Sequence, residues 1–380
     1  SAAELGIPQD LYPSVGEAGL LILNEDVPPG TGLAETLCLD DTVADFEILA
    51  NRPDCYSVLG LARETAATLG TDFLQREPTV REAGGDVRGY AQVEVRDERL
   101  CPRYMARVVR NVRLRPSPLW LRARLHAAGI RAISNVVDIT NYVMLETGHP
   151  MHAFDLGQVR GRQIVVRAAE KGETLTTLDG KNHLLSGGEL LICDAEGPTG
   201  LAGIMGGQES EITGNTREIL FECAAFDRTQ TRITARGLGI RTESSSRFER
   251  GVNPATVGQA MARAMELVNL LDAGDVVGGA VDLYPNPAMP ARFPVSVSRV
   301  AHRAGTDIKG DEMAAILRRL FFETELAGDR LEVGVPAFRQ DVEGEADVCE
   351  EVLRLYGYDR IPETNLRGET LPGRDSAPRM

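Results

Sequence analysis

The sequence predicts a multidomain protein of the α/β and α+β classes, in which a mixed-sheet domain precedes a small winged-helix-like domain. The chain has 380 residues, and at roughly 100–200 residues per domain this predicts two or three domains. Short β-rich runs split by Gly or Asp turns occur among apolar patterns of helical period. Residues 284–290, YPNPAMP, contain three prolines in seven positions and predict a linker.

The first predicted domain, residues 1–95, is an N-terminal α+β unit that forms part of a split domain. FEIL at residues 46–49 predicts a short strand, and NRPDC after it a turn. A helix is predicted from Ser57 to Leu69, because Leu59, Ala62 and Ala66 follow a helical period, and Gly70 is a suitable stop. The polar segment 81–86 separates this unit from the next.

The second predicted domain, residues 96–285, mixes strands and helices. A strand is expected at 103–112, and Ser117-Pro118 is expected to cap a helix that ends at Gly129. Ser134 is expected to cap the next helix, which ends at Gly148, and a long helix is expected from Asn253-Pro254. Between these helices lie the strand-like runs QIVVRAA, TLTTLDG, ELLICDA, GLAGIMGG and EILFECAAF.

The third predicted domain, residues 286–365, is the small winged-helix-like unit, and residues 366–380 are predicted to be a linker or tail. FPVSVS and LEVGVP predict strands. Asp311 is expected to cap a helix with an apolar stripe through Met313, Ile316, Leu317 and Leu320. A last helix is expected at about Glu345–Tyr356, stopped by Gly357.

Composition limits the classes of partner. The chain has 41 Lys and Arg against 56 Asp and Glu, a net charge of −15. This argues against a wide nucleic-acid-binding face, which needs clustered cations, but not against a local contact with one RNA end. The six cysteines include no CxxC pair, and therefore predict free thiols in a reducing cytoplasm rather than a zinc site or disulfides. No apolar run approaches the length of about 20 residues that a membrane span needs.

The stretch 134–155, SNVVDITNYVMLETGHPMHAFD, is the first candidate for function. His152 is either a structural histidine or a group near a scissile bond that moves a proton or positions water. HPMH is a poor metal site, because no third ligand is near. Asp155 either orients His152 or caps the next turn. A plain core helix does not need Thr140 and Asn141 so close to these residues.

Glu222 is the second candidate, because it is an acid inside the apolar run ILFECAAF. Burial of an unpaired carboxylate is costly, so a donor partner or a raised pKa is expected. The alternatives are a structural hydrogen bond and an acceptor that recognises a ligand hydroxyl or amine. The four glycines of GLAGIMGG allow a close approach to the backbone, or else form a bulge.

Two further clusters have competing interpretations. RTESSSRFERG, residues 241–251, is rich in hydroxyls but lacks a GxSxG nucleophile motif, which argues against a covalent serine mechanism. Asp347, Glu350 and Glu351 share one helix face near Asp341. These four acids are either a solvated acidic surface or ligands for a hard cation such as Mg²⁺.

Taken together, the chain resembles the β subunit of bacterial phenylalanyl-tRNA synthetase. The matching segments run in the family's order to residue 362 and are NRPDCYSVLGLARE, SNVVDITNYVMLETGHPMHAFD, LAGIMGG, FECAAFD, RGLGIRTESSSRFERGVNP and FRQDVEGEADVCEEVLRLYGYDRIP. The resemblance implies that the second domain is an editing domain that hydrolyses tyrosine wrongly esterified to tRNA(Phe).

The resemblance also assigns residues and partners. It implies catalytic roles for His152, Glu222 and Thr242, and Mg²⁺ ligation in the winged-helix-like domain. It implies an α subunit that binds ATP and carries the synthetic site, in a cytoplasmic α2β2 heterotetramer that aminoacylates tRNA(Phe). The implied substrate-binding residues are Thr140, Asn141, Gly203 and Ser244, and the implied Mg²⁺ ligands are Asp341, Asp347, Glu350 and Glu351.

The chain also departs from the family. Ser244 stands where the family often has alanine, and the family's N-terminal tRNA-binding module and C-terminal modules are missing. We therefore expect a fragment that binds tRNA weakly and does not aminoacylate alone. The first hypothesis is a tRNA ester hydrolase. The second is a non-enzymatic scaffold for the α subunit with an inactive pocket. A metallohydrolase that uses the acidic cluster is disfavoured, because that cluster and His152 lie on different units.

Overall fold

The computed structural model describes residues 6–7, 11–12, 21–23, 26–287, 289–363, 365 and 368. They form two compact units, the first comprising the chain up to Pro290 together with Ala337–Asp341, and the second Ala291–Pro336 together with the chain from Val342. The predicted tail at 366–380 lies outside the described residues except for Gly368. None of the described helices is both long and apolar enough to cross a membrane.

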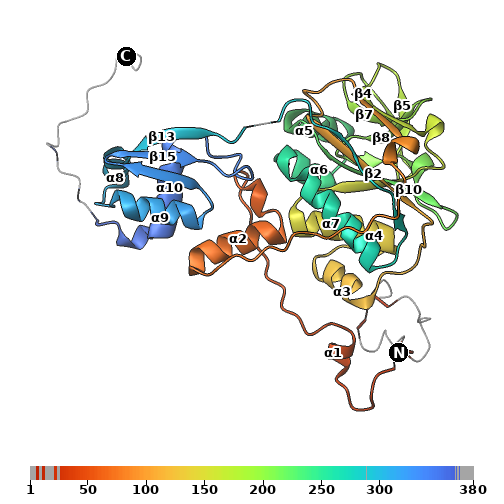
Figure 1. The fold of residues 1–380 in the computed structure, drawn as a ribbon, viewed down its shortest axis with the longest axis horizontal. Coiled ribbons are helices and arrows are strands. Elements are labelled where there is room, and N and C mark those ends of the chain that lie inside the picture. The colour runs from red at the N-terminus through yellow and green to blue at the C-terminus, as the bar shows by residue number, and fades with distance from the viewer. Residues whose placement is uncertain are drawn as a thin grey trace, which may run out of the picture. The chain divides into compact units, whose positions relative to one another are not determined.

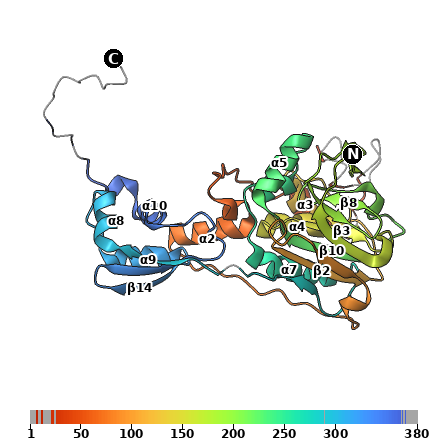
Figure 2. The same ribbon diagram turned by 90° about the horizontal axis from the view of Figure 1, so that it is seen from above.

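Unit 1 is built on two larger sheets and a small two-stranded sheet (Figures 1 and 2). Its α-helices are α1 (Leu33–Thr36), α2 (Val58–Leu69), α3 (Leu119–Ala127), α4 (Asn135–Thr147), α5 (Arg228–Leu238), α6 (Glu243–Phe248) and α7 (Val257–Leu270). Its strands are β1 (Gln92–Val95), β2 (Arg103–Arg110), β3 (Met151–Asp155), β4 (Gln163–Ala168), β5 (Thr174–Thr176), β6 (Asn182–Leu184), β7 (Leu190–Cys193), β8 (Pro198–Leu201), β9 (Met205–Gly206), β10 (Glu218–Ala225), β11 (Asp275–Val276) and β12 (Val281–Leu283).

The central sheet has the order β11-β2-β10-β3, with β12 also on β2. The second sheet, β1-β4-β7-β8-β9, is mixed, because β1 and β4 are parallel and the other pairs antiparallel. The predicted mixed-sheet fold class is therefore confirmed.

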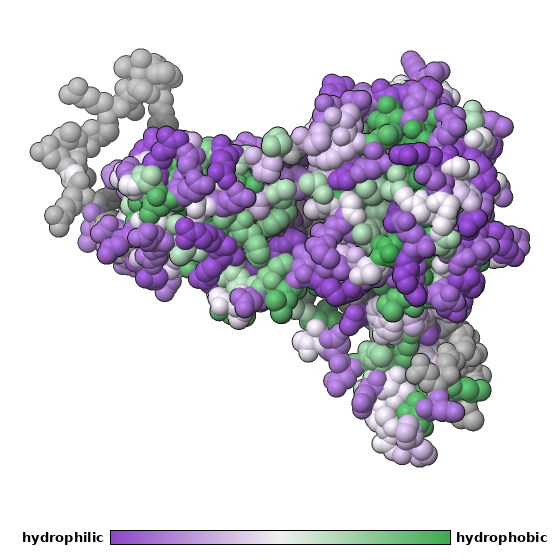
Figure 3. All heavy atoms as spheres, viewed as in Figure 1, coloured by the Kyte–Doolittle hydropathy of each residue, from purple (hydrophilic) through white to green (hydrophobic). Residues whose placement is uncertain are grey.

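Unit 1 is layered. One face of the central sheet packs on α3, α4 and α7 through a core that includes Phe221, Ile139 and Met265. Its other face packs on the second sheet through Tyr104 and Ile192, among others. The far side of the second sheet packs against α5, as Figure 1 shows. The face of unit 1 seen in Figure 3 is mainly hydrophilic, with scattered apolar patches.

Unit 2 has the order strand, two helices, hairpin and helix, which is a winged-helix-like arrangement. Its antiparallel sheet has the order β13-β15-β14. The apolar stripe of Met313, Ile316, Leu317 and Leu320 is buried as predicted. The elements are β13 (Arg292–Ser296), α8 (Val297–Ala304), α9 (Gly310–Arg319), β14 (Glu323–Ala327), β15 (Arg330–Gly334) and α10 (Glu345–Tyr356).

Several local predictions are confirmed by the helix ends. Ser57 and Ser134 accept from the backbone N–H of Gly60 and Val137 at the starts of α2 and α4. Gly70 and Gly148 end the same helices with φ of 68° and 77°. A serine just before a helix accepts a hydrogen bond from an N–H of the first turn that has no partner within the helix. Glycine ends a helix well because it adopts positive φ at little cost.

Three local predictions are wrong. Residues 46–49 form no strand, and Phe46 and Leu49 are exposed because no described strand pairs with them. Ser117 does not cap α3; its hydroxyl donates to Asp138 Oδ2 at 2.6 Å, and Pro118 takes the N-cap position. Asp311 lies in the first turn of α9, after Lys309 as N-cap, where its charge suits the helix dipole.

Candidate functional site

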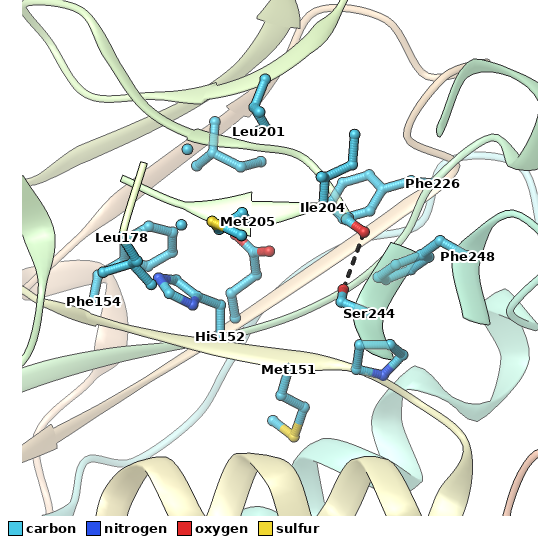
Figure 4. A pocket seen from close by; sticks show the side chains of 16 residues that line it. Met151, His152, Phe154, Leu178, Leu201, Ile204, Met205, Phe226, Ser244 and Phe248 are labelled. Carbon is cyan, nitrogen blue, oxygen red and sulfur yellow. Dashed lines mark hydrogen bonds between the residues drawn. The ribbon is translucent and has the colours of Figure 1, made fainter. Parts of the chain in front are cut away.

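A cavity of about 210 Å³ opens between the two sheets of unit 1. Its lining comes from β3, the 200–206 segment, β10 and α6, and Figure 4 shows its side chains. In the figure, His152 and Phe154 lie on one side, Phe226 and Phe248 on the other, and Met151 points away toward a helix. The lining residues are Pro150, Met151, His152, Phe154, Leu178, Ile192, Gly200, Leu201, Gly203, Ile204, Met205, Gly206, Glu222, Phe226, Ser244 and Phe248.

Strand register brings the two principal polar residues together. On β10, Glu222 is directly opposite His152 on β3 and Ala106 on β2. Since side chains alternate along a strand, Glu222 and His152 share the face that looks toward the second sheet, while Phe221 and Cys223 face the helices. Two residues about 70 positions apart in the sequence thus line one cavity.

Glu222 is only 6% exposed and has one side-chain donor, Tyr104, whose hydroxyl lies 2.7 Å from Oε2. Burial raises the pKa of Glu222 to about 7, although the Tyr104 hydrogen bond opposes this by stabilising the carboxylate. Oε1 accepts no hydrogen bond from the described residues. Glu222 therefore has both of the features that were expected as alternatives, a donor partner and a raised pKa.

Tyr104 is a site residue that the sequence interpretation missed. It is fully buried on β2, and burial raises the pKa of its phenol well above the ordinary value, so the hydroxyl stays protonated and donates. A tyrosine in a β-rich run is common, so the run itself does not indicate a role for Tyr104. Only the pairing of β2 with β10 places its hydroxyl beside Glu222.

His152 is neutral at physiological pH. Burial lowers the pKa of its imidazole to about 4. Its ring makes an edge contact with Phe154, with centroids 4.4 Å apart. Gly206 allows the ring to sit against the backbone, because a Cβ at that position would lie 2.5 Å from His152 Cε1. A neutral imidazole of this pKa is a weak base, but it donates or accepts a hydrogen bond to position a ligand or water.

His149 is a structural neighbour rather than a lining residue. It is fully buried, with Nε2 2.9 Å from the Ala224 carbonyl and Nδ1 3.3 Å from Thr256 Oγ1. Burial lowers its pKa to about 4. It therefore ties the Gly148–Pro150 turn to β10, next to the cavity.

The glycine-rich wall is held by α6. Thr242 caps this helix by accepting from Ser245 N at 3.0 Å, and it donates to the Ile204 carbonyl at 2.9 Å. Ser244 donates to the Gly203 carbonyl at 3.1 Å. Gly203 has φ of +70°, and a Cβ there would come within 3.0 Å of Phe226 and Phe248. These hydrogen bonds hold the 200–206 segment against α6, and the rings of Phe226 and Phe248 limit how closely Gly203 approaches.

The structure thus brings together four of the seven predicted pocket residues, namely His152, Gly203, Glu222 and Ser244. The other three are not among the lining residues of this cavity. Thr242 holds the wall from behind, and Thr140 donates to the Val137 carbonyl within α4. Asn141 is half-buried on the same helix. Asp155 accepts from Thr216 at 2.6 Å and from Gly157 N, which makes it a turn cap.

The four predicted metal ligands divide between the units. In unit 1, Arg339 binds both oxygens of Asp341, at 2.9 and 2.8 Å. On α10, Asp347 accepts from the N–H groups of Glu343 and Gly344, and Glu351 pairs with Arg354 at 2.7 Å. Oxygen donors suit Mg²⁺, but the described α10 acids do not converge on one point. Asp347 and Glu351 already accept from backbone and arginine donors, and Glu350 is exposed, so the described contacts do not form a metal site.

One group of metal-type ligands does converge among the described residues, at Asp54, Cys55 and Glu64. The guanidinium of Arg52 binds both carboxylates there, at 2.8 and 2.7 Å. An arginine already supplies the positive charge of this cluster, which therefore stabilises the start of α2.

Comparison with known proteins identifies the family. The model of the B3/4 domain matches residues 100–272, and that of the tRNA synthetase B5 domain matches residues 293–358. The phenylalanine–tRNA ligase β subunit of Clostridium acetobutylicum is 44% identical over 97% of this chain and 46% of its own length. The chain belongs to the family of phenylalanine–tRNA ligase β subunits.

As a member of this family, the chain spans about half the length of the curated β subunits that it matches. The β subunit of Thermotoga maritima is also 44% identical, over 89% of this chain and 42% of its own length. Among solved structures, an N-terminal fragment of the phenylalanyl-tRNA synthetase β subunit from Pyrococcus horikoshii covers 81% of this chain at 17% identity, with a TM-score of 0.42. This chain covers 85% of that fragment.

The contact between Tyr104 and Glu222 leads to a prediction about stability. Tyr104→Phe removes a donor to the ionised carboxylate and should raise the pKa of Glu222 above about 7. Because this folded pKa is raised, the contribution of Glu222 to stability is full below the unfolded pKa of about 4.3 and is lost as pH rises through the folded pKa. The destabilisation caused by Tyr104→Phe should therefore be larger at pH 8 than at pH 5.

Chemical unfolding at both pH values measures this difference. Among the described residues, the titratable neighbours of Glu222 stay outside that window, because burial lowers the pKa of His152 to about 4 and raises those of Cys101 and Cys223 well above the ordinary value. Tyr142→Phe, which removes a hydroxyl that accepts from Arg124, is the matched control. An equal effect of Tyr104→Phe at both pH values would contradict the assignment.

Proposed function

We propose that the cavity is an editing site that hydrolyses tyrosine esterified to tRNA(Phe), and that residues 96–285 act as an editing domain. The observation that carries the proposal is Glu222, a buried carboxylate with one free oxygen at the wall of a cavity lined by aromatic rings. Apolar cavities of about 150 Å³ bind benzene, so about 210 Å³ suits a phenol ring.

Recognition of tyrosine follows from the free oxygen. Tyr104 already donates a phenolic hydroxyl to Oε2 of Glu222, which leaves Oε1 to accept a second phenol. Phenylalanine would fill the same space and leave that oxygen buried without a donor. A site built to hydrogen-bond a hydroxyl rejects the ligand that lacks it by about 10⁴–10⁵, whereas a purely apolar pocket separates the two poorly.

Hydrolysis in this proposal rests on positioning. Water attacks the ester carbonyl carbon, the bond from that carbon to the ribose oxygen breaks, and the ribose oxygen takes the proton. His152, neutral and opposite Glu222, holds the water or the ester, and the wall of Gly203 and Ser244 limits how deep the amino acid enters. Glu222 selects the substrate and does not need to act as a base.

The proposed editing function is tested by measuring the deacylation of Tyr-tRNA(Phe) and Phe-tRNA(Phe) with the 380-residue chain in excess over the RNA. We expect hydrolysis of the tyrosyl ester at least ~100-fold faster than that of the phenylalanyl ester, as hydroxyl recognition requires. Rates for both esters equal to spontaneous hydrolysis would leave this chain as a scaffold without editing activity.

We further propose, from the names of its relatives, that the chain supports phenylalanyl-tRNA formation together with an α subunit, and that Asp341, Asp347, Glu350 and Glu351 take Mg²⁺ in that complex. For the chain without the α subunit, the described contacts predict that Mg²⁺ does not bind. Asp347→Ala with Glu351→Ala removes the carboxylate that accepts from the N–H groups of Glu343 and Gly344, and also the carboxylate that lies 2.7 Å from Arg354. Loss of the acceptor at the start of α10 costs about 0.5–2 kcal/mol, and loss of the partly exposed pair with Arg354 adds up to about 1 kcal/mol.

Thermal unfolding with Mg²⁺ and with chelator measures this effect. We expect a lower Tm in the double variant and no effect of Mg²⁺ on the Tm of the wild-type chain. Glu363→Ala, at an exposed acid outside the proposed ligand set, is the control. A Tm that rises with Mg²⁺ in the wild type and not in the double variant would instead show that the isolated chain holds the ion.

A further inference from the structure

Helix α5 presents a row of arginines to solvent. Arg228, Arg232 and Arg236 are four residues apart and exposed, and exposed Arg241 follows the end of the helix at Gly239. Residues four apart lie on one face of a helix, about 6 Å apart along its axis. We call these four residues the arginine stripe.

The arginine stripe lacks counter-charges. None of its members forms an ion pair with any residue that the structure describes, and residues 228–242 contain no Asp or Glu. Elsewhere in unit 1, exposed arginines do find acids: Arg76 binds Glu266 and Arg113 binds Asp272. In a chain with a net charge of −15, four neighbouring unpaired cations are a local exception that attracts an anion.

The buried face of α5 packs against elements next to the cavity, which places the arginine stripe near it. Thr231, Thr234 and Ala235 are buried, and α5 packs on β7 and α6. Helix α6 contributes Ser244 and Phe248 to the cavity lining. Figure 2 shows α5 at the outside of unit 1, and Figure 1 shows α6 next to it.

The last member of the stripe is next to the cavity wall. Arg241 lies between Ile240, which packs in the same apolar cluster as Ile204 and Met205, and Thr242, which donates to the Ile204 carbonyl. Ile204 and Met205 both line the cavity. The stripe therefore runs from the N-terminus of α5 to the edge of the proposed editing site.

We propose that the arginine stripe binds the phosphates of the acceptor end of an aminoacylated RNA while its ester enters the cavity. This inference rests on the proposed function, because an ester-linked ribose in the cavity places the preceding nucleotides at its edge. Guanidinium groups bind phosphate through paired N–H donors and stay charged at any physiological pH. An acidic protein partner is the alternative that the experiment excludes.

The experiment measures binding of deacylated tRNA to the 380-residue chain by filter retention, over about 50–200 mM salt. The variant is Arg228→Gln, Arg232→Gln and Arg236→Gln together. Each lost phosphate contact should reduce the magnitude of the slope of log K against log salt by about 0.7–0.9, hence by about 2–3 in total for three contacts. We expect affinity at the lowest salt to fall at least ~10-fold, and deacylation to need more enzyme for half-maximal rate with an unchanged maximal rate.

The matched control is Arg88→Gln, Arg131→Gln and Arg318→Gln, which removes the same charge from three exposed arginines without ion pairs among the described residues. Both variants should keep the wild-type Tm, because the substituted side chains are exposed. Absence of tRNA binding by the wild type, equal losses in both variants, or a lowered maximal rate alone would overturn the proposal. Loss of binding in the stripe variant without any deacylation by the wild type would uphold the surface and reject the editing function.

Discussion

Glu222→Ala is expected to lower the rate of Tyr-tRNA(Phe) deacylation by roughly 10- to 150-fold and to leave the slow rate on Phe-tRNA(Phe) nearly unchanged. A hydrogen bond to a charged group contributes about 1.5–3 kcal/mol, and each 1.4 kcal/mol is about tenfold. The loss falls on the tyrosyl ester, because only its ring carries the hydroxyl that Oε1 accepts. Single-turnover rates with both esters measure it.

Glu222→Gln separates charge from shape. It keeps an acceptor oxygen of similar position but loses the negative charge, so its rate on the tyrosyl ester should fall between wild type and Glu222→Ala. The wild-type rate should rise with pH through about 7 beyond the spontaneous rate, as Glu222 ionises, and this rise should vanish in Glu222→Gln. Equal rates on the tyrosyl ester in wild type and Glu222→Ala would reject hydroxyl recognition by this residue.

Gly206→Ala is expected to close the cavity. The new Cβ would lie 2.5 Å from Cε1 and 2.7 Å from Nε2 of His152. His152 cannot retreat easily, because its strand pairs with β10 and its ring contacts Phe154. Overpacking of this kind costs about 1–3 kcal/mol, and a displaced imidazole also removes the group that positions the ester. We expect a lower free energy of unfolding together with at least ~10-fold slower deacylation, since misplacement of about 1 Å can cost about 10²-fold.

Gly214→Ala is the matched control for Gly206→Ala. Nothing lies within 4 Å of the Cβ that it would add, and its backbone does not require glycine. It should keep wild-type stability and activity. Full activity and full stability of Gly206→Ala would contradict the packing of His152 against the 200–206 segment.

Local chemistry made part of the fold predictable. Ser134 satisfies an N–H group three residues further on, so its predicted capping follows from sequence alone. Ser117 has the same chemistry but donates to Asp138, 21 positions away, and the local rule fails there. The predicted strand at 46–49 fails for the same reason, because a strand needs a partner that a short apolar run does not specify.

The candidate site was likewise predictable from the sequence only in part. A carboxylate in an apolar run and a histidine among polar residues are visible in the sequence, and both line the cavity. Their direct opposition across β10 and β3, and the hydroxyl of Tyr104 on Glu222, depend on strand register, which no local pattern determines. The phenylalanine rings of the wall were absent from the prediction, because aromatic residues in apolar runs are usually core.

The most direct test of hydroxyl recognition is binding without chemistry. Calorimetry at pH 8, where Glu222 is ionised, would compare 3′-amide-linked tyrosyl- and phenylalanyl-adenosine, which the site cannot hydrolyse as esters. We predict at least ~10-fold tighter binding of the tyrosyl compound, as one charged hydrogen bond provides, and loss of that preference in Glu222→Ala. Equal affinities in the wild-type chain, or a preference that persists in Glu222→Ala, would contradict the account.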